Sequence, residues 1–211
     1  MKRFILGVSI AAVLVLTGCG QQKNASTDKT NGKEDQTMAS IAGKKVLMII
    51  ASNKFRDEEL FESRKVLNQA GAVTIVASSK VGTITGMLGG EAEASADIKK
   101  VKVSDYDAVI FVGGTGAGEY FNDPTAHKIA QEAASAGKVV GAICIAPSTL
   151  ANAGLLKGKK ATCYVSEKAN LIAKQAEYSG KGVEVDGKII TADGPGSAKA
   201  FGQALVKALQ E

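Results

Sequence analysis

Four short, continuous apolar runs alternate with helix-like segments from residue 44 onward, and this alternation limits the possible folds more than any other feature of the sequence. Apolar runs of this length suit strands that are covered on both faces, as in a parallel sheet. The helical segments between them imply βαβ units, with helices on both faces of the sheet. The runs are 44–52, 72–79, 106–114 and 138–143. The sequence therefore predicts an α/β fold built on a mainly parallel sheet.

Two helices are predicted between these runs. The segment 56–71 begins with acidic residues, which stabilise the positive end of a helix. In the segment 123–137, Asp123 is placed as the N-cap, Pro124 occupies the first helical position and Gly137 follows the last turn. The buried stripe of the first helix is expected to consist of Leu60, Ser63, Leu67 and Ala70.

The remaining segments predict smaller elements. Glycines and small alternating residues in 81–98 indicate a hairpin or an irregular excursion. A second hairpin is expected to turn at Asp186-Gly187, and a final helix to start near Ser197.

The carboxyl ends of the predicted strands are where parallel sheets form their sites. The end of the fourth run is the most informative, because Cys144 follows the strand directly and Pro147 is placed to begin a helix. Backbone N–H groups and the helix dipole would favour a thiolate there, on a strand–turn–helix that resembles a nucleophile elbow. Free cysteine is also among the most buried residue types, so a core cysteine is the alternative.

Two further features could complete such a site. The pair Gly113-Gly114 ends a strand and would let backbone N–H groups approach a ligand, as an oxyanion site requires. Glu59 lies at a helix start, where an acid also fits simply because it stabilises the helix dipole. His127, the only histidine of the chain, is expected on a solvated helix face. The usual Cys–His pair therefore has no obvious second member.

The N-terminal region predicts export. Basic residues, an apolar run and small residues precede Cys19, as in a secretory signal, and the segment from Leu16 to Cys19 resembles the lipobox of bacterial lipoproteins. The predicted organisation is a signal peptide in 1–18, the lipidated Cys19 with a flexible tether in 19–43, and a folded domain in 44–211. Lipidation would anchor the chain to a bacterial membrane on its extracytoplasmic side. Scattered basic residues and the absence of Trp argue against a nucleic-acid partner.

Four stretches of residues 44–211 together resemble the ThiJ/PfpI family in their order and spacing. They are "FRDEELFESRKVLNQAGAVTIVAS", "DYDAVIFVGGTGAG", "GKVVGAICIAPSTLANAGLLKGKKAT" and "DGKIITADGPGSAKAFGQALVKAL". The resemblance implies a flavodoxin-like three-layer sandwich of the class I glutamine amidotransferase type, a homodimer, and no cofactor or metal. It also implies that Cys144 is the reactive cysteine, that Glu59 approaches its thiol as a protonated acid, and that Gly113, Gly114 and Ile145 provide the oxyanion site.

Three positions depart from the family pattern. The residue after the cysteine is histidine in the protease-like branch and is Ile145 here. A second family histidine falls at Tyr164, and an arginine expected before the Gly-Pro-Gly segment is Asp193, which removes an anion contact. Tyr164 and Asp193 are therefore expected only as possible substrate contacts.

These residues favour a cysteine-dependent glyoxalase or deglycase-like enzyme that acts on small reactive 2-oxoaldehydes or their adducts. The alternative is a redox-sensing or chaperone-like stress protein that uses the same thiol. A PfpI-type peptidase or amidase is a third hypothesis, weakened by the missing histidines. Cys163 is expected to be a small core residue rather than the partner of Cys144 in a disulfide.

Overall fold

The computed structural model describes residues 40–211, so the predicted signal peptide, Cys19 and nearly all of the tether lie outside the described residues. Packing begins before the predicted domain boundary at residue 44. Ile41 is buried, and its N–H group donates to the carbonyl oxygen of Ala70 at 2.8 Å. The last residues assigned to the tether are therefore part of the folded domain.

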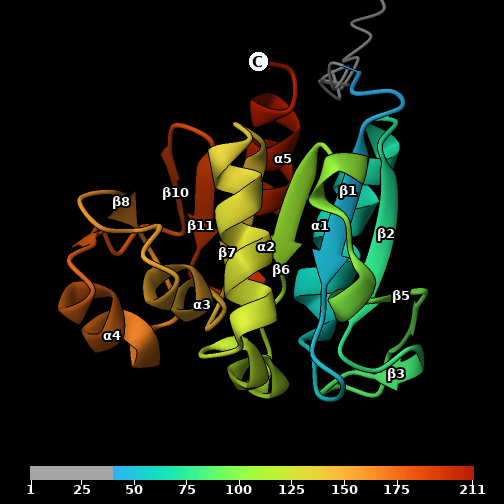
Figure 1. Ribbon diagram of the computed structural model, residues 1–211, viewed down its shortest axis with the longest axis horizontal. Coiled ribbons are helices and arrows are strands. Elements are labelled where there is room, and N and C mark those ends of the chain that lie inside the picture. Colours follow the sequence, from blue (N-terminus) through green and yellow to red (C-terminus); the bar gives the residue numbers. More distant parts are fainter. Residues whose placement is uncertain (1–39) are drawn as a thin grey trace, which may run out of the picture. The chain divides into compact units, whose positions relative to one another are not determined.

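A seven-stranded sheet runs through the centre of the domain (Figure 1). Its strands lie in the order β10-β11-β7-β6-β1-β2-β5. Every neighbouring pair is parallel except β10 and β11, which are antiparallel. The strands are β1 (Lys45–Ile49), β2 (Val73–Ser78), β5 (Ala96–Asp97), β6 (Ala108–Phe111), β7 (Val139–Ile143), β10 (Val183–Asp186) and β11 (Ile189–Ala192).

Side chains of the central strands alternate between two buried cores, one on each face of the sheet. In β1, Val46 and Met48 join one core, while Leu47 and Ile49 join the other. This explains why the strand is a continuous apolar run, since both of its faces are covered.

Helices cover both faces of the sheet, and Figure 1 shows α2 in front of it with α1 and α5 behind. The predicted stripe of α1 is confirmed, because Leu60, Ser63, Leu67 and Ala70 are all buried. The helices are α1 (Asp57–Gln69), α2 (Pro124–Ser135), α3 (Pro147–Asn152), α4 (Lys168–Ala173) and α5 (Ala198–Ala208). Short 3-10 turns are η1 (Ile98–Lys100), η2 (Val103–Asp105), η3 (Thr115–Tyr120), η4 (Val165–Glu167) and η5 (Pro195–Ser197).

The smaller predicted elements are present too. Strands β3 (Gly82–Thr85) and β4 (Glu91–Ala94) form an antiparallel hairpin. Strands β8 (Lys160–Ala161) and β9 (Glu177–Tyr178) form a separate parallel pair that was not predicted from the sequence. The predicted hairpin turn at Asp186-Gly187 joins β10 to β11.

The predicted flavodoxin-like α/β fold is confirmed. Its consequence for function is that the segments after β1, β6, β7 and β11 meet at one edge of the sheet. Within residues 40–211, no helix is both long enough and apolar enough to cross a bilayer.

Candidate active site

Cys144 lies on a strained turn between β7 and α3. Its backbone has φ of +64°, a left-handed conformation that non-glycine residues adopt rarely. Two hydrogen bonds hold it there: its N–H group donates to the carbonyl oxygen of Ala192 at 2.9 Å, and the N–H group of Tyr164 donates to its carbonyl oxygen at 2.7 Å. The turn therefore has the geometry of a nucleophile elbow.

Gly113 allows the acid and the thiol to meet. Its N–H group donates to Oε2 of Glu59 at 3.0 Å. A β-carbon added at this glycine would lie 2.5 Å from that oxygen and 2.6 Å from Cβ of Cys144, which no side chain tolerates. The N–H group predicted for the oxyanion site is thus already bound to Glu59, and Gly113 is not among the residues that line the pocket of Cys144.

Burial controls the ionisation of Glu59. Its side chain is completely buried at the start of α1, and burial raises the pKa of the carboxyl group from 4.5 to about 7, against the opposing effects of the Cys144 thiol, the Gly113 N–H group and Arg56. Its second oxygen, Oε1, has no hydrogen-bond partner among the residues that the structure describes. The direction of this shift is the one that the family resemblance implied.

The thiol of Cys144 is not the low-pKa group that the helix start led us to expect. Burial raises its pKa to about 12, and the charge and hydrogen bond of Glu59 raise it further, while the N–H groups of Gly114 and Ile145 lower it. The side chain is only 8% exposed, and α3 has just six residues, so its dipole is weak. The two groups therefore share one negative charge, and the thiolate gains stability only when Glu59 holds the proton.

Gly114 and Ile145 bring backbone donors to the sulfur atom, as predicted. Gly114 has φ of +101°, and a β-carbon there would lie 2.3 Å from the backbone nitrogen of Arg56. Only glycine fits this position, where the chain after β6 packs against the loop before α1. The result is a pair of N–H groups beside the thiol, an arrangement that stabilises oxyanions.

A pocket of about 460 Å³ opens above the thiol. The structure brings five of the predicted site residues together in its wall: Glu59, Gly114, Cys144, Ile145 and Tyr164. Its size lies within the usual range for small-molecule sites.

The loop between β3 and β4 closes one side of this pocket, and the sequence analysis missed it. Met87 lines the pocket, and its sulfur accepts a hydrogen bond from the N–H group of Thr115 at 3.3 Å. Asp57 fixes the loop, since its carboxylate accepts from the N–H groups of Leu88 at 2.8 Å and Gly90 at 2.7 Å. The signal available in the sequence was the glycine-rich stretch 86–90, although nothing in it indicates where the loop folds.

Two charged residues of the pocket were also missed. The guanidinium group of Arg56 forms a two-point ion pair with Glu58, at 2.8 and 3.0 Å, and this pair occupies part of its donor capacity. Glu167 accepts hydrogen bonds from Ser148 at 2.7 Å and Ser166 at 2.9 Å. Both come from loops or helix ends, whose spatial neighbours no local pattern reveals.

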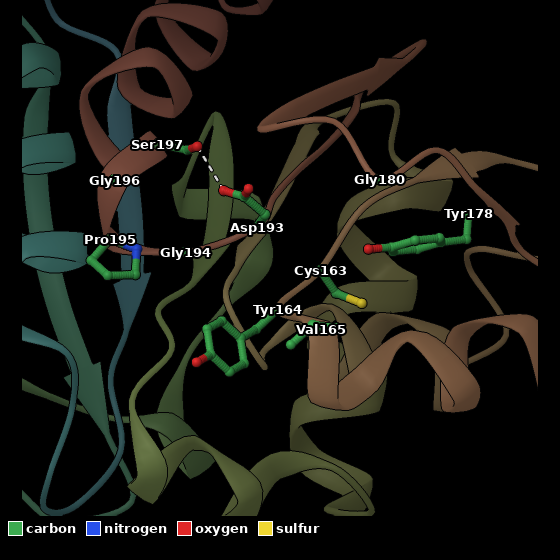
Figure 2. A pocket seen from close by; sticks show the side chains of 10 residues that line it. All are labelled: Cys163, Tyr164, Val165, Tyr178, Gly180, Asp193, Gly194, Pro195, Gly196 and Ser197. Atoms are coloured by element: carbon green, nitrogen blue, oxygen red, sulfur yellow. Dashed lines mark hydrogen bonds between the residues drawn. The ribbon is translucent and has the colours of Figure 1, made fainter.

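The other candidate residues lie away from the thiol. Asp193 lines a neighbouring pocket rather than that of Cys144 (Figure 2). His127 is half-buried on α2, where its Nε2 atom lies 2.8 Å from the carbonyl oxygen of Phe121, so the expected solvated position is only partly right. Cys163 is buried in the core, as expected, and both it and Cys144 are free thiols. Among residues 40–211, no group of His, Cys, Asp or Glu side chains is arranged to hold a metal ion.

The fold and the site together define a class of protein. A mainly parallel α/β sandwich with a cysteine on a strained strand–helix turn, beside a buried carboxyl group, is a flavodoxin-like protein with a nucleophile elbow. Within this class, the chain belongs to the DJ-1/PfpI family, whose model matches residues 44–208.

Individual relatives cover most of the chain. An uncharacterized protein of Methanocaldococcus jannaschii is 41% identical over 185 residues, which are 86% of this chain and 89% of that protein. The deglycase PfpI of Pyrococcus furiosus is 30% identical over 164 residues, 78% of this chain and 99% of the relative. A glutathione-independent glyoxalase of Caenorhabditis elegans is 24% identical over 169 residues, 80% and 90% of the two chains. The crystal structure of a ThiJ/PfpI domain protein from Brachyspira murdochii has a TM-score of 0.78 at 32% identity, and the match covers 80% of this chain and 98% of that one.

Proposed function

We propose that the domain is a cysteine-dependent glyoxalase or deglycase-like enzyme for small 2-oxoaldehydes or their adducts. The observation that carries the proposal is the pairing of Cys144 with Glu59, a buried acid whose pKa is raised to about 7, beneath two backbone donors. The names deglycase and glyoxalase borne by relatives support the same chemistry.

The first step is addition of the thiol to the aldehyde carbon. Glu59, in its carboxylate form, accepts the thiol proton as the sulfur of Cys144 attacks. A C–S bond forms, and the electron pair of the C=O bond moves to oxygen, beside the N–H groups of Gly114 and Ile145. Glu59 then returns the proton to this oxygen, and a hemithioacetal results.

The second step moves hydrogen between the two carbonyl carbons. Glu59 removes the proton from the former aldehyde carbon to give an enediol, and then delivers a proton to the adjacent carbon. The first carbon is thereby oxidised to a thioester while the second is reduced to an alcohol, so no external oxidant or reductant is needed. Water hydrolyses the thioester, which releases a 2-hydroxy acid and restores the thiol.

The pKa of Glu59 suits this shuttle. A group with a pKa of about 7 is present in both protonation states near neutral pH, so it can accept and donate a proton within one cycle.

The test is turnover of methylglyoxal by the purified chain, followed as consumption of the aldehyde and formation of lactate. We expect Cys144→Ser to abolish turnover, and Glu59→Gln to reduce it by roughly 100-fold or more, since positioned acid–base groups contribute this much. Glu93→Gln, which neutralises an exposed carboxylate on β4, is the matched control and should retain turnover. Equal rates for the wild type and Cys144→Ser would refute the proposal.

The peptidase hypothesis and the redox-sensing hypothesis are tested by different observations. No imidazole lines the pocket, because the only histidine of the chain, His127, lies against Phe121. A peptidase of the Cys–His type would need such a group. The redox-sensing hypothesis predicts that mild peroxide oxidises Cys144 ahead of Cys163. If the chain shows no methylglyoxal turnover, mass spectrometry after peroxide treatment tests this order of oxidation.

The membrane tether is a separate part of the proposal and is supported by residues 1–43 alone. If Cys19 is lipidated, the chain should be recovered with membranes after expression in a bacterium, and Cys19→Ala should move it to the aqueous fraction. The homodimer also stays a prediction, which analytical ultracentrifugation can check.

A further inference from the structure

A second pocket of about 340 Å³ adjoins the pocket of Cys144. Tyr164 and Pro195 line both pockets, so the two share a wall. In Figure 2, Asp193 and Ser197 approach the second pocket from the segment after β11, Tyr178 from β9 and Tyr164 from the segment after β8. We call this second pocket the flanking pocket.

The proposed aldehyde substrate does not need the flanking pocket. A molecule as small as methylglyoxal occupies roughly 100 Å³, judged from the about 30 Å³ that one water molecule takes in the liquid. The pocket of Cys144, at about 460 Å³, already exceeds this volume. The flanking pocket is therefore not needed for the aldehyde itself, and its shared lining residues place it next to the pocket where the reactive carbon of a larger molecule would lie.

The chemistry of the flanking pocket favours a cation. Asp193 is the only charged side chain among its lining residues in the described part of the chain. Its Oδ1 atom accepts a hydrogen bond from the hydroxyl group of Ser197 at 2.6 Å, which leaves the second carboxylate oxygen for a ligand. Tyr164 and Tyr178 add aromatic rings, whose faces attract ammonium and guanidinium groups.

Neighbouring charges do not reverse this preference. The guanidinium group of Arg56, in the pocket of Cys144, is already paired with Glu58, whereas Glu167 adds a carboxylate to the same pocket. Lys168 lies 5.3 Å from the centre of the Tyr178 ring, but its side chain is exposed, so water and salt screen its charge. The aromatic face that remains for a ligand is therefore chiefly that of Tyr164, which lines both pockets.

We propose that the flanking pocket binds the carrier portion of an adduct formed by a 2-oxoaldehyde, and that Asp193 selects carriers with an ammonium or guanidinium group. The proposal rests on the proposed function of Cys144. In the reaction, the bond between the carrier and the former aldehyde carbon breaks as the C–S bond to Cys144 forms, and the carrier leaves with a proton. The later steps consume one water and release the 2-hydroxy acid, so the adduct and water yield the free carrier and the acid.

Direct binding tests the flanking pocket without any turnover. Lysine and glutamate, each blocked as the N-acetyl amide, would be titrated into the full chain carrying Cys144→Ser, with NMR or calorimetry as the readout. We expect the lysine derivative to bind more tightly, and Asp193→Asn to weaken its binding roughly three- to tenfold. Asparagine keeps an acceptor for Ser197, so the local fold is preserved. Asp105→Asn, which removes an exposed aspartate that also accepts from a neighbouring serine, is the control and should leave binding unchanged.

Kinetics then separate this inference from the proposed function. The substrates are methylglyoxal hemithioacetals of dimethylaminoethanethiol, which is cationic, and of mercaptopropionate, which is anionic. We expect a higher kcat/KM for the cationic carrier and loss of this preference in Asp193→Asn.

Each outcome has a distinct meaning. Turnover of both adducts without a charge preference, or with a preference that Asp193→Asn leaves intact, would overturn the inference and leave the proposed function standing. Absence of turnover with charge-selective binding that Asp193→Asn removes would refute the function and support the flanking pocket as a cation site. Equal binding of the lysine and glutamate derivatives would overturn the inference whatever the kinetics.

Discussion

Replacing Glu59 by Gln should change how the stability of the domain depends on pH. Glutamine has nearly the same shape, keeps an oxygen that can accept from the N–H group of Gly113, and carries no titratable group. The substitution therefore removes the ionisation of Glu59 while disturbing the packing of this completely buried position as little as possible.

The size and sign of the effect follow from the raised pKa. The carboxyl group titrates near 4.5 in the unfolded chain and at about 7 in the folded domain. Between these values the folded state binds more protons than the unfolded state, so the free energy of unfolding falls as the pH rises through this window. Compared with high pH, the domain has the full extra stability at pH values below the pKa of Glu59 in the unfolded chain. This extra stability is lost at pH values above the pKa of Glu59 in the folded domain. At about 1.4 kcal/mol per pKa unit, the loss is about 3 kcal/mol.

Urea unfolding followed by circular dichroism, at several pH values from about 4 to about 8, measures the effect. All other titrating groups contribute nearly equally to the wild type and Glu59→Gln, so the difference between the two isolates Glu59. We expect the variant to gain about 3 kcal/mol relative to the wild type across this range. Glu93→Gln, at an exposed position, should follow the wild type at every pH.

The reasoning would be refuted if the free energy of unfolding of the wild type and that of Glu59→Gln differed by the same amount at every pH. Such a result would mean that the pKa of Glu59 in the folded domain equals its value in the unfolded chain. Repeating the pair of measurements in a Cys144→Ser background removes the coupled thiol. The pH-dependent difference should persist there, because burial is the largest cause of the shift.

Two other substitutions test the architecture around the thiol. Gly113→Ala places a β-carbon 2.5 Å from the Glu59 carboxylate, so it should cost about 1–3 kcal/mol of stability and greatly reduce methylglyoxal turnover, whereas Gly118→Ala, at a site with open space, should do neither. A melting temperature and turnover equal to those of Gly118→Ala would count against this account. Asp57→Ala removes the acceptor of the N–H groups of Leu88 and Gly90. It should lower the free energy of unfolding by about 2 kcal/mol and speed hydrogen exchange at these two amides, and Asp57→Asn should have an intermediate effect. Unchanged exchange at these two amides would show that Asp57 does not hold the loop.

The site residues that could be predicted from the sequence are those that directly follow a predicted strand. Cys144 and Gly114 each follow a buried apolar run, and parallel strands bring their carboxyl ends to one edge. Met87 and Glu167 were missed because they come from a hairpin loop and a 3-10 turn, which reach the pocket only through long-range packing. The thiol pKa was mispredicted because a local pattern indicates the helix dipole but not the burial.

The sequence by itself determined the layered α/β fold and the position of Cys144 at the end of a strand, because both follow from local periodicity and from the order of strands, turns and helices. Only the tertiary structure decided which groups surround the Cys144 thiol. The acid that shares its charge comes from a distant helix, and the contact exists only because Gly113 has no side chain. Tertiary packing also placed Asp193 in a pocket that adjoins the pocket of Cys144, since pocket walls arise from segments that are neighbours in space and far apart along the chain.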